Sequence, residues 1–430
     1  MNAFAALRGR LPAPVQQRDF GLFAVVVLAM VLGNQMIAVA IGWQVYDVHH
    51  KAFDLGLIGL LEFAPMLILA IPAGQLNDRL SRRLVLLGAL ALSCGVAGGL
   101  ILVNATDSHV LWPFLALAVA DGTSNALAFP ASRSLPPLLV EREQVGGAMA
   151  IRSVLNQTGQ VGGPALGGLL FAIDPQAAYA TALALFAVGV ACALPIRLRA
   201  PGGSRPAEPL SLQTMLAGIR FIAGSPILLG AISLDLFAVL LGGAVALLPV
   251  FAQTILHTGP AGLGVMRSAP ALGAVIAGVV LVRHPLPAHA GPVLLGCVAG
   301  FGASIVAFGF SRALPLSVAT LAISGACDMF SVNIRTVAVT YATPDWVRGR
   351  VGAVEGVFIG ASNQLGAFES GATAALLGAV PAVVGGGAAT IAVAALWSRL
   401  FPSLARLDRM QDLEPGRGDG GELAASAEPA

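Results

Sequence analysis

A few ionisable side chains lie inside long apolar segments of this chain, where a charge is costly. Asp121, Asp235 and Asp328 each fall near the middle of such a segment, and Arg335 follows Asp328 two helical turns later. Insertion scales put the cost of a charged side chain at the centre of a bilayer at roughly 2.5–3.5 kcal/mol. Residues that carry this cost normally face a cavity or a partner. They predict ion pairing or proton exchange inside a membrane.

The composition predicts a polytopic membrane protein. Of the 430 residues, 57% are hydrophobic and 11% are charged, with mean hydropathy +0.83; soluble domains carry roughly 25% charged residues. A membrane span needs about 20 apolar residues, and the apolar runs lack the alternation of barrel strands. They predict an all-α protein with twelve transmembrane helices, at about 20–46, 55–76, 84–104, 110–131, 145–171, 176–196, 226–253, 261–282, 290–311, 313–340, 350–378 and 382–400.

Arginine and lysine residues gather in the segments on one side of these spans. The loops of the other side contain only Lys51 and Arg312, so the positive-inside rule predicts that both termini are cytoplasmic, with the chain in the plasma membrane. The net charge of +2 follows from this distribution and does not indicate nucleic-acid binding. The cysteines and histidines form no ligand cluster, and there is no nucleophile motif or P-loop. We therefore expect no metal, no cofactor, no enzyme activity and no ATP-driven pumping.

The chain divides into two halves. Residues 197–225 form a predicted cytoplasmic linker that ends in an amphipathic helix from Leu210 to Ile222. Four residue pairs repeat across the halves at one spacing of 202, which indicates a duplicated unit: Arg133 and Arg335, Glu143 and Asp345, Val145 and Val347, Gly147 and Gly349. The predicted organisation is a cytoplasmic N-terminal segment (1–19), a six-helix half (20–196), the linker (197–225), a second six-helix half (226–401) and a disordered cytoplasmic tail (402–430).

Two motifs carry a resemblance to a known family. The charged turn Gly74-Gln-Leu-Asn-Asp78-Arg79-Leu-Ser81-Arg82-Arg83 resembles the loop 2–3 signature of the major facilitator superfamily, with Ser81 where the family usually has glycine. The fifth apolar segment fits the pattern of the antiporter signature of exporters in that superfamily, at Gly159, Gly163, Pro164, Gly167 and Gly168. Small residues four apart let helices approach closely, and the proline bends the helix. Ordinary glycine-rich packing is the alternative, since the chain has 52 glycines.

Together with Phe129-Pro130-Ala131 and the run from Asp345 to Arg350, these motifs are similar to the branch that includes the enterobactin exporter and drug-efflux proteins. The resemblance covers about residues 20–400 and implies that helices 1, 4, 7 and 10 line a central cavity. It thereby favours a substrate or proton-coupling set of Asp235, Asp328, Asp121, Arg335, Asn34 and Gln35. Many antiporters have Arg-Gly in helix 4, where this chain has Asp121-Gly122, so that arginine's coupling role is not carried over. Alternatively, some of these residues only join helices, as Asp328 would with Asn333 or Arg335.

Two gates follow from the same resemblance. Glu62, Arg267 and Glu369 lie at about one depth near the external side and predict an ion-pair gate; snorkelling towards the interface is the alternative reading. At the cytoplasmic side, Gly74 permits close packing. Asp78 is expected to bind the N-terminal end of helix 11, and Arg79 and Arg83 to engage loop carboxylates or lipid headgroups.

The predicted function is proton-coupled efflux of small amphipathic organic molecules, such as drugs or siderophores, by alternating access. The expected partners are a small-molecule substrate, protons and the lipid bilayer, and the expected oligomeric state is a monomer. The alternative is uptake, facilitative transport or lipid transport by the same fold.

Overall fold

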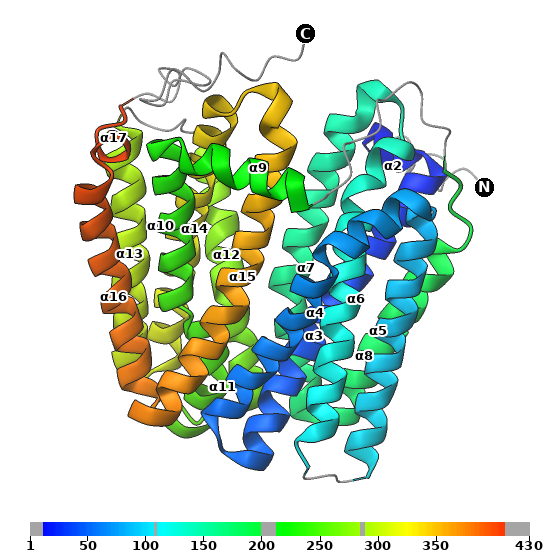
Figure 1. Ribbon diagram of the computed structural model, residues 1–430. Helices are drawn as coiled ribbons and strands as arrows, with labels where there is room; N and C mark the ends of the chain where they lie inside the picture. The colour runs from blue at the N-terminus through cyan, green and yellow to red at the C-terminus, as the bar shows by residue number, and fades with distance from the viewer. Residues whose placement is uncertain (1–11, 107–109, 199–211, 284–288, 409–430) are drawn as a thin grey trace. The chain divides into compact units, whose positions relative to one another are not determined.

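The computed structural model describes residues 12–106, 110–198, 212–283 and 289–408, and this part of the chain is helical without strands (Figure 1). It contains the twelve expected long helices, and an all-α fold is confirmed. These are α3 (Arg18–His49), α4 (Ala52–Arg79), α5 (Arg82–Ala105), α6 (Trp112–Ser134), α7 (Val145–Ile173), α8 (Pro175–Ala193), α10 (Pro226–Leu241) with its continuation to Ile255, α12 (Gly259–Arg283), α13 (Ala290–Phe310), α14 (Leu314–Ala342), α15 (Asp345–Leu377) and α16 (Ala379–Leu400).

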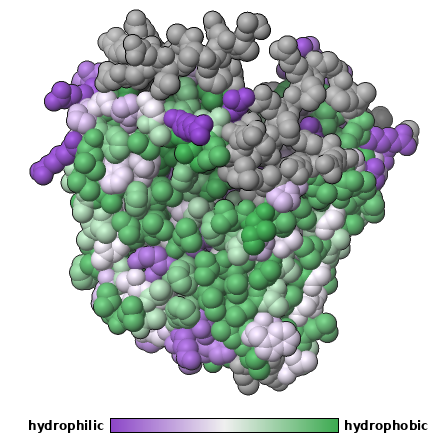
Figure 2. All heavy atoms as spheres, viewed as in Figure 1, coloured by the Kyte–Doolittle hydropathy of each residue, from purple (hydrophilic) through white to green (hydrophobic). Residues whose placement is uncertain are grey.

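Length and hydropathy alone qualify nine of the described helices as membrane spans, and α6, α7 and α15 are not among them. Two of these three are the helices that carry Asp121 and Glu369, together with several amides. The outward surface of the spans is apolar: Ile68, Val282 and Leu376 are 71%, 87% and 84% exposed. Figure 2 shows apolar side chains over most of the face that it draws. In water such a surface would be an aggregation hazard, whereas hydrocarbon solvates it.

The chain folds into two units. The first comprises residues up to His50, Leu61–Pro209 and Thr258–Ser268, and the second comprises Lys51–Leu60, Leu210–His257 and the chain from Ala269. They differ from the two predicted halves in that the first turns of α4 belong to the second unit and the first turns of α12 to the first. Close packing accounts for this exchange: Gly56 of α4 lies against Gly371 of α15, and Gly264 of α12 lies against Gly168 of α7.

Within the first unit, α3 packs on α7 and α8, and α5 packs on α6 and α8. Within the second unit, α13 packs on α14 and α16, and α10 packs on α15 and α16. The second and fourth helices of each unit cross at a glycine. A Cβ on Gly122 of α6 would meet the carbonyl oxygen of Glu62 in α4, and one on Gly325 of α14 would meet that of Pro270 in α12.

The seventh predicted span is interrupted. Helix α10 ends at Leu241, and the chain continues through Gly242 and Gly243 into a 3₁₀ turn, a short helical segment α11 (Leu248–Val250) and a π-helical turn up to Ile255. Two adjacent glycines weaken a helix, because each pays a large backbone entropy. Gly366 of α15 and Gly386 of α16 leave room for the carbonyl groups at the end of α10.

The short elements lie at the ends of the long helices: α2 (Ala13–Gln16), η1 (Pro136–Leu138), η2 (Arg142–Gln144), α9 (Leu212–Ala223) and α17 (Pro402–Ala405). In Figure 1, α9 runs across α10 and α15, and Gly218 packs on the backbone of Arg350. The sequence predicted a disordered tail from residue 402, but residues 402–405 form the helix α17 and residues 406–408 are also described. Leu404 and Leu407 are buried, and backbone N–H groups at the start of α13 donate to carbonyls of Leu407 and Asp408. Residues 409–430 lie outside the described part of the chain.

Candidate functional site

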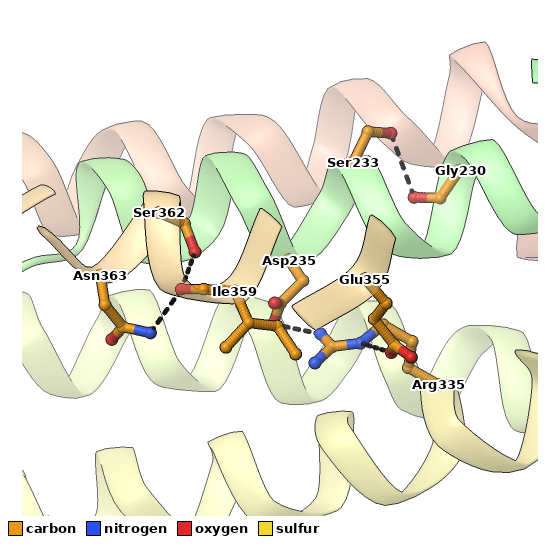
Figure 3. A network of polar contacts seen from close by, with 8 residues as sticks. All are labelled: Gly230, Ser233, Asp235, Arg335, Glu355, Ile359, Ser362 and Asn363. Carbon is orange, nitrogen blue, oxygen red and sulfur yellow. Dashed lines mark hydrogen bonds and ion pairs between the residues drawn. The ribbon is translucent and has the colours of Figure 1, made fainter. Parts of the chain in front are cut away.

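A buried ion-pair centre joins three helices of the second unit (Figure 3). Arg335 projects from α14 and forms ion pairs with Asp235 of α10 and Glu355 of α15. The Arg335 side chain is 3% exposed, and those of Asp235 and Glu355 are 11% and 18% exposed. A charge at this depth is tolerated only when it is paired. The predicted residues Asp235 and Arg335 are thus brought together, with Glu355 as a third member.

The pairs in this centre depend on charge more than on aligned hydrogen bonds. The Nε atom of Arg335 lies 3.5 Å from Oε1 of Glu355, and its Nη1 atom contacts Oδ1 of Asp235. Neither nitrogen has an acceptor in hydrogen-bond geometry among the described residues.

Asp328 lies beside this centre without an ion pair of its own in the described structure. Its carboxyl group interacts electrostatically with Asp235 and Arg335. Asp235 and Asp328 both line a crevice between α10, α13 and α14, with Ser331, Cys297, Cys327 and Phe301. The empty volume of about 240 Å³ includes open solvent, so the enclosed space is far smaller than the roughly 300–1,000 Å³ of drug-sized sites. The crevice therefore suits water and protons better than an organic molecule.

In the first unit, a series of side-chain hydrogen bonds connects α3 and α6. Asn34 Nδ2 donates to Oδ1 of Asn125 at 2.7 Å, and Asn125 Nδ2 donates to Oδ2 of Asp121 at 2.9 Å. Asp121 is 8% exposed, and its other oxygen has no partner among the described residues, like the amide oxygen of Asn34. Gln35, predicted as part of the same set, instead packs its Cβ against Gly163 of α7.

The predicted external gate is divided between the units. Glu62 and Arg267 both belong to the first unit and interact electrostatically. Glu369 belongs to the second unit, where its carboxylate accepts a hydrogen bond of 2.8 Å from Thr373 Oγ1 one turn along α15. The described contacts thus connect two of the three predicted gate residues.

The helix 5 motif forms a packing surface on α7. Gly159, Gly163, Pro164, Gly167 and Gly168 are all buried. A Cβ on any of the first three glycines would collide with α3, and one on Gly168 with the first turns of α12. The small residues are therefore required by helix contacts, whatever role they have in antiport.

The loop 2–3 motif is described in part. For Gly74, Asp78 and Arg79 the structure describes the helical backbone of α4 but not the surroundings of these residues. Arg83 donates to the carbonyl oxygens of Ala193, at 3.1 Å, and Leu194. This differs from the expected contact with loop carboxylates or lipid, because the last carbonyls of α8 lack intrahelical partners and attract a cation.

Ser81 explains the departure from glycine in the same turn. Its backbone is extended, with φ −64° and ψ 130°, and its side chain caps α5 by accepting a hydrogen bond from the Leu84 N–H at 3.3 Å. A positive φ is not needed here, so glycine is not needed either.

Two residues of these sites were missed by the sequence reasoning. Glu355 is an acid within a predicted span, and that signal could have found it. Asn125 lies one turn after Asp121 on the same helix face, a spacing that could have identified it.

Comparison with known proteins places this geometry in a family. A family model described as transmembrane secretion effector, MFS_3, matches residues 11–415. The enterobactin exporter EntS of Citrobacter koseri is 27% identical over 86% of this chain and 89% of its own length. That of Shigella dysenteriae is 28% identical over 74% of this chain and 76% of its own.

Solved structures share the fold. A point mutant of the nucleoside transporter NupG superposes with a TM-score of 0.71 at 12% identity, covering 89% of this chain and 100% of that one. A bacterial homologue of the human lysosomal transporter Spinster, in an inward-facing and occupied conformation, gives a TM-score of 0.70 at 13% identity, with 92% and 98% covered.

Proposed function

Because this chain belongs to the MFS_3 family of major facilitator superfamily membrane transporters, we propose that it exports small amphipathic organic molecules, such as drugs or siderophores, in exchange for protons. The kinship with enterobactin exporters supports the direction of transport. The buried centre of Asp235, Arg335 and Glu355 supports the proton coupling, and it is the observation on which the proposal depends.

The coupling follows from how one buried cation is shared. A proton on Asp235 would cancel its charge and leave Arg335 to Glu355 alone. Breaking one partner from a buried ion pair costs about 3–5 kcal/mol, and about 5.5 kcal/mol moves a two-state equilibrium from 1:99 to 99:1. A single protonation in this centre therefore has the energy to redistribute two conformations of α10 against α14 and α15.

Asp328 is the second proposed proton site. It shares the crevice with Asp235 and feels the charges of both Asp235 and Arg335. Water in that crevice would connect the two carboxyl groups, so that a proton entering at one can reach the other.

The first unit would contribute the polar contacts to cargo. One oxygen of Asp121 and the amide oxygen of Asn34 are buried without a partner in the described structure; in a conformation that exposes them, they would accept hydrogen bonds from a bound molecule. In this proposal, the interaction of Glu62 with Arg267 serves the external gate, and Asp78 and Arg79 serve the cytoplasmic latch.

The proposed orientation places both termini in the cytoplasm of a plasma-membrane protein that acts as a monomer. An even number of spans puts the two ends on one side, and the excess of arginine on that side identifies it as cytoplasmic.

Everted membrane vesicles with an acid interior provide the test. Addition of drugs, dyes and siderophores should release protons for at least one compound, and the double variant D235N/D328N should abolish this response while remaining folded. Asp47→Asn is the matched control, because Asp47 is exposed at the end of α3. Undiminished coupling in the double variant would rule out the assignment. No response to any compound from the folded protein would favour uptake or lipid transport.

A further inference from the structure

Three guanidinium groups gather around the last turn of α6 in the first unit. Arg82 of α5 donates from Nη1 to the carbonyl oxygen of Ser134 at 3.0 Å. Arg152 of α7 donates from Nη2 to Oγ of Ser132 at 3.2 Å. Arg133 belongs to the turn itself, and its guanidinium carbon lies 4.7 Å from the centroid of the Phe129 ring. We refer to Arg82, Arg133 and Arg152 as the arginine cluster.

The charge of the arginine cluster is not compensated within the described structure. Its acceptors are a carbonyl, a hydroxyl and an aromatic face, all of them neutral. The ion pairs of Arg335 with Asp235 and Glu355, and of His289 with Asp408, involve other groups, and Arg152 is repelled by Arg133. The Nε atom of Arg152 is buried without an acceptor among the described residues. A buried donor without an acceptor needs an explanation, and a bound water or anion is one such explanation.

The C-terminal end of α6 does not account for the cluster. A helix C-terminus carries about half a negative charge, which is small against three cations. Arginines at a membrane surface also serve as topology signals, but that role requires neither convergence on one turn nor a buried, unpaired Nε.

We propose that the arginine cluster is an oxyanion site, which binds a carboxylate, phosphate or phenolate group of an amphipathic molecule. Arginine forks match such oxygens in pairs of hydrogen bonds. The ring of Phe129 is 48% exposed beside Arg133, so the site offers a flat apolar surface next to its charges. This combination selects an anion attached to an aromatic or apolar body.

The site lies at the end of the first unit where the described chain begins. Gln17, beside α2, donates to Gln144 just before α7 at 2.6 Å, and α2 packs on both α3 and α7. If the proposed efflux is correct, this is the side from which cargo enters, and the positive charges would raise the local concentration of anionic cargo there. This substrate class rests on the proposed function, whereas the oxyanion chemistry does not. Anionic lipid headgroups are the other source of the same chemistry.

Binding to the purified full chain in nanodiscs tests the site without a proton gradient. The probes are 1-naphthoate and its uncharged analogue 1-naphthamide, measured by equilibrium dialysis in phosphatidylcholine discs. The protein should bind naphthoate at least tenfold more tightly than naphthamide, and R133Q/R152Q should reduce this ratio to near one. Arg133→Gln alone, at an exposed position, should reduce it several-fold without a folding defect. Arg312→Gln is the control, because Arg312 is also exposed and donates only to carbonyls of Gly309 and Ser311.

The outcomes separate the two sources of oxyanion. If phosphatidylglycerol in the discs competes with naphthoate in the unmodified protein but not in R133Q/R152Q, the membrane occupant is a lipid phosphate. If it does not compete, cargo is the occupant. A ratio near one for the unmodified protein in both lipids, or a ratio unchanged in R133Q/R152Q, would overturn the proposal. Normal naphthoate binding in D235N/D328N would show that this site is independent of proton coupling.

Discussion

Arg133 and Arg335 occupy equivalent positions in the two halves, 202 residues apart, yet their surroundings differ. Arg335 is 2% exposed and paired with two carboxylates, whereas Arg133 is exposed, lies over an aromatic ring and has a second arginine nearby. At the same spacing, the position of Glu355 corresponds to Ser153 in the first half. The matched positions thus share an arginine, while among the described residues only the one in the second half is paired with acids.

The helix crossings, in contrast, are alike in both halves. Gly122 lets α6 approach the backbone of α4, and Gly325 lets α14 approach the backbone of α12. The two units therefore share a scaffold and differ in charge. In the proposed function, proton exchange belongs to the second unit and the attraction of anions to the first, and substitutions at matched positions can test this division.

The largest expected effect is that of Arg335→Gln. It would leave Asp235 and Glu355 buried without a cation, and the loss of one member of a buried ion pair costs about 3–5 kcal/mol. We expect a sharply lower unfolding midpoint in detergent and no proton response. Arg335→Lys should retain part of the stability, since the charge remains but the fork is lost. A midpoint near that of the unmodified protein for Arg335→Gln would contradict the buried centre.

The second largest effect on stability is expected at the two glycine helix crossings, and it should be equal in the two halves. Gly122→Ala and Gly325→Ala each place a methyl group against a backbone carbonyl of the neighbouring helix, and overpacking of this kind costs about 1–3 kcal/mol. Gly95→Ala in α5 and Gly296→Ala in α13 are the controls, because a Cβ there meets no atom within 4 Å. Thermal unfolding of all four variants measures the effect. A large loss in one half only would show that the scaffolds are not equivalent.

A smaller effect is expected at Asn125, whose amide joins Asn34 to Asp121. Hydrogen bonds between membrane helices average about 0.6 kcal/mol, so Asn125→Leu should lower stability by about 1 kcal/mol. Thr123→Val is the control, since the Thr123 hydroxyl donates only to Val119 of its own helix. An equal shift in both variants would show that this series of hydrogen bonds contributes nothing specific to stability.

The sequence predicted the elements well because each span must satisfy its backbone within itself and is long and apolar. It also drew attention to Asp235 and Arg335, which form an ion pair in the structure, because a charge inside a span is rare. It did not reveal the break after Leu241, since Gly242 and Gly243 are apolar enough to continue a hydropathy run. The exchange of the first turns of α4 and α12 between the units was also hidden, because it depends on glycine contacts distant in sequence.

The partners of the charged residues were harder to predict than the residues themselves. Glu355 stands out as an acid within a span, but its partner does not: Arg335 lies on α14, and the two meet because α14 and α15 both pack against α10. Likewise, Arg83 was predicted to contact acids or lipid, but it donates to the carbonyl oxygens at the end of α8. Pair formation depends on which helix faces meet, and hydropathy does not encode those faces.

The smallest effect on stability, and the sharpest contrast with Arg335, is expected for Arg133→Gln. Surface substitutions usually change stability by less than about 0.5 kcal/mol, so the unfolding midpoint should stay within error. If the first half attracts anions, the same variant should raise the KM for transport of an anionic compound several-fold and leave an uncharged analogue unaffected, as measured in everted vesicles. Equal KM changes for both compounds would mean that Arg133 acts on transport generally. The charge difference between the halves would then serve to orient the protein in the membrane and not to select substrates.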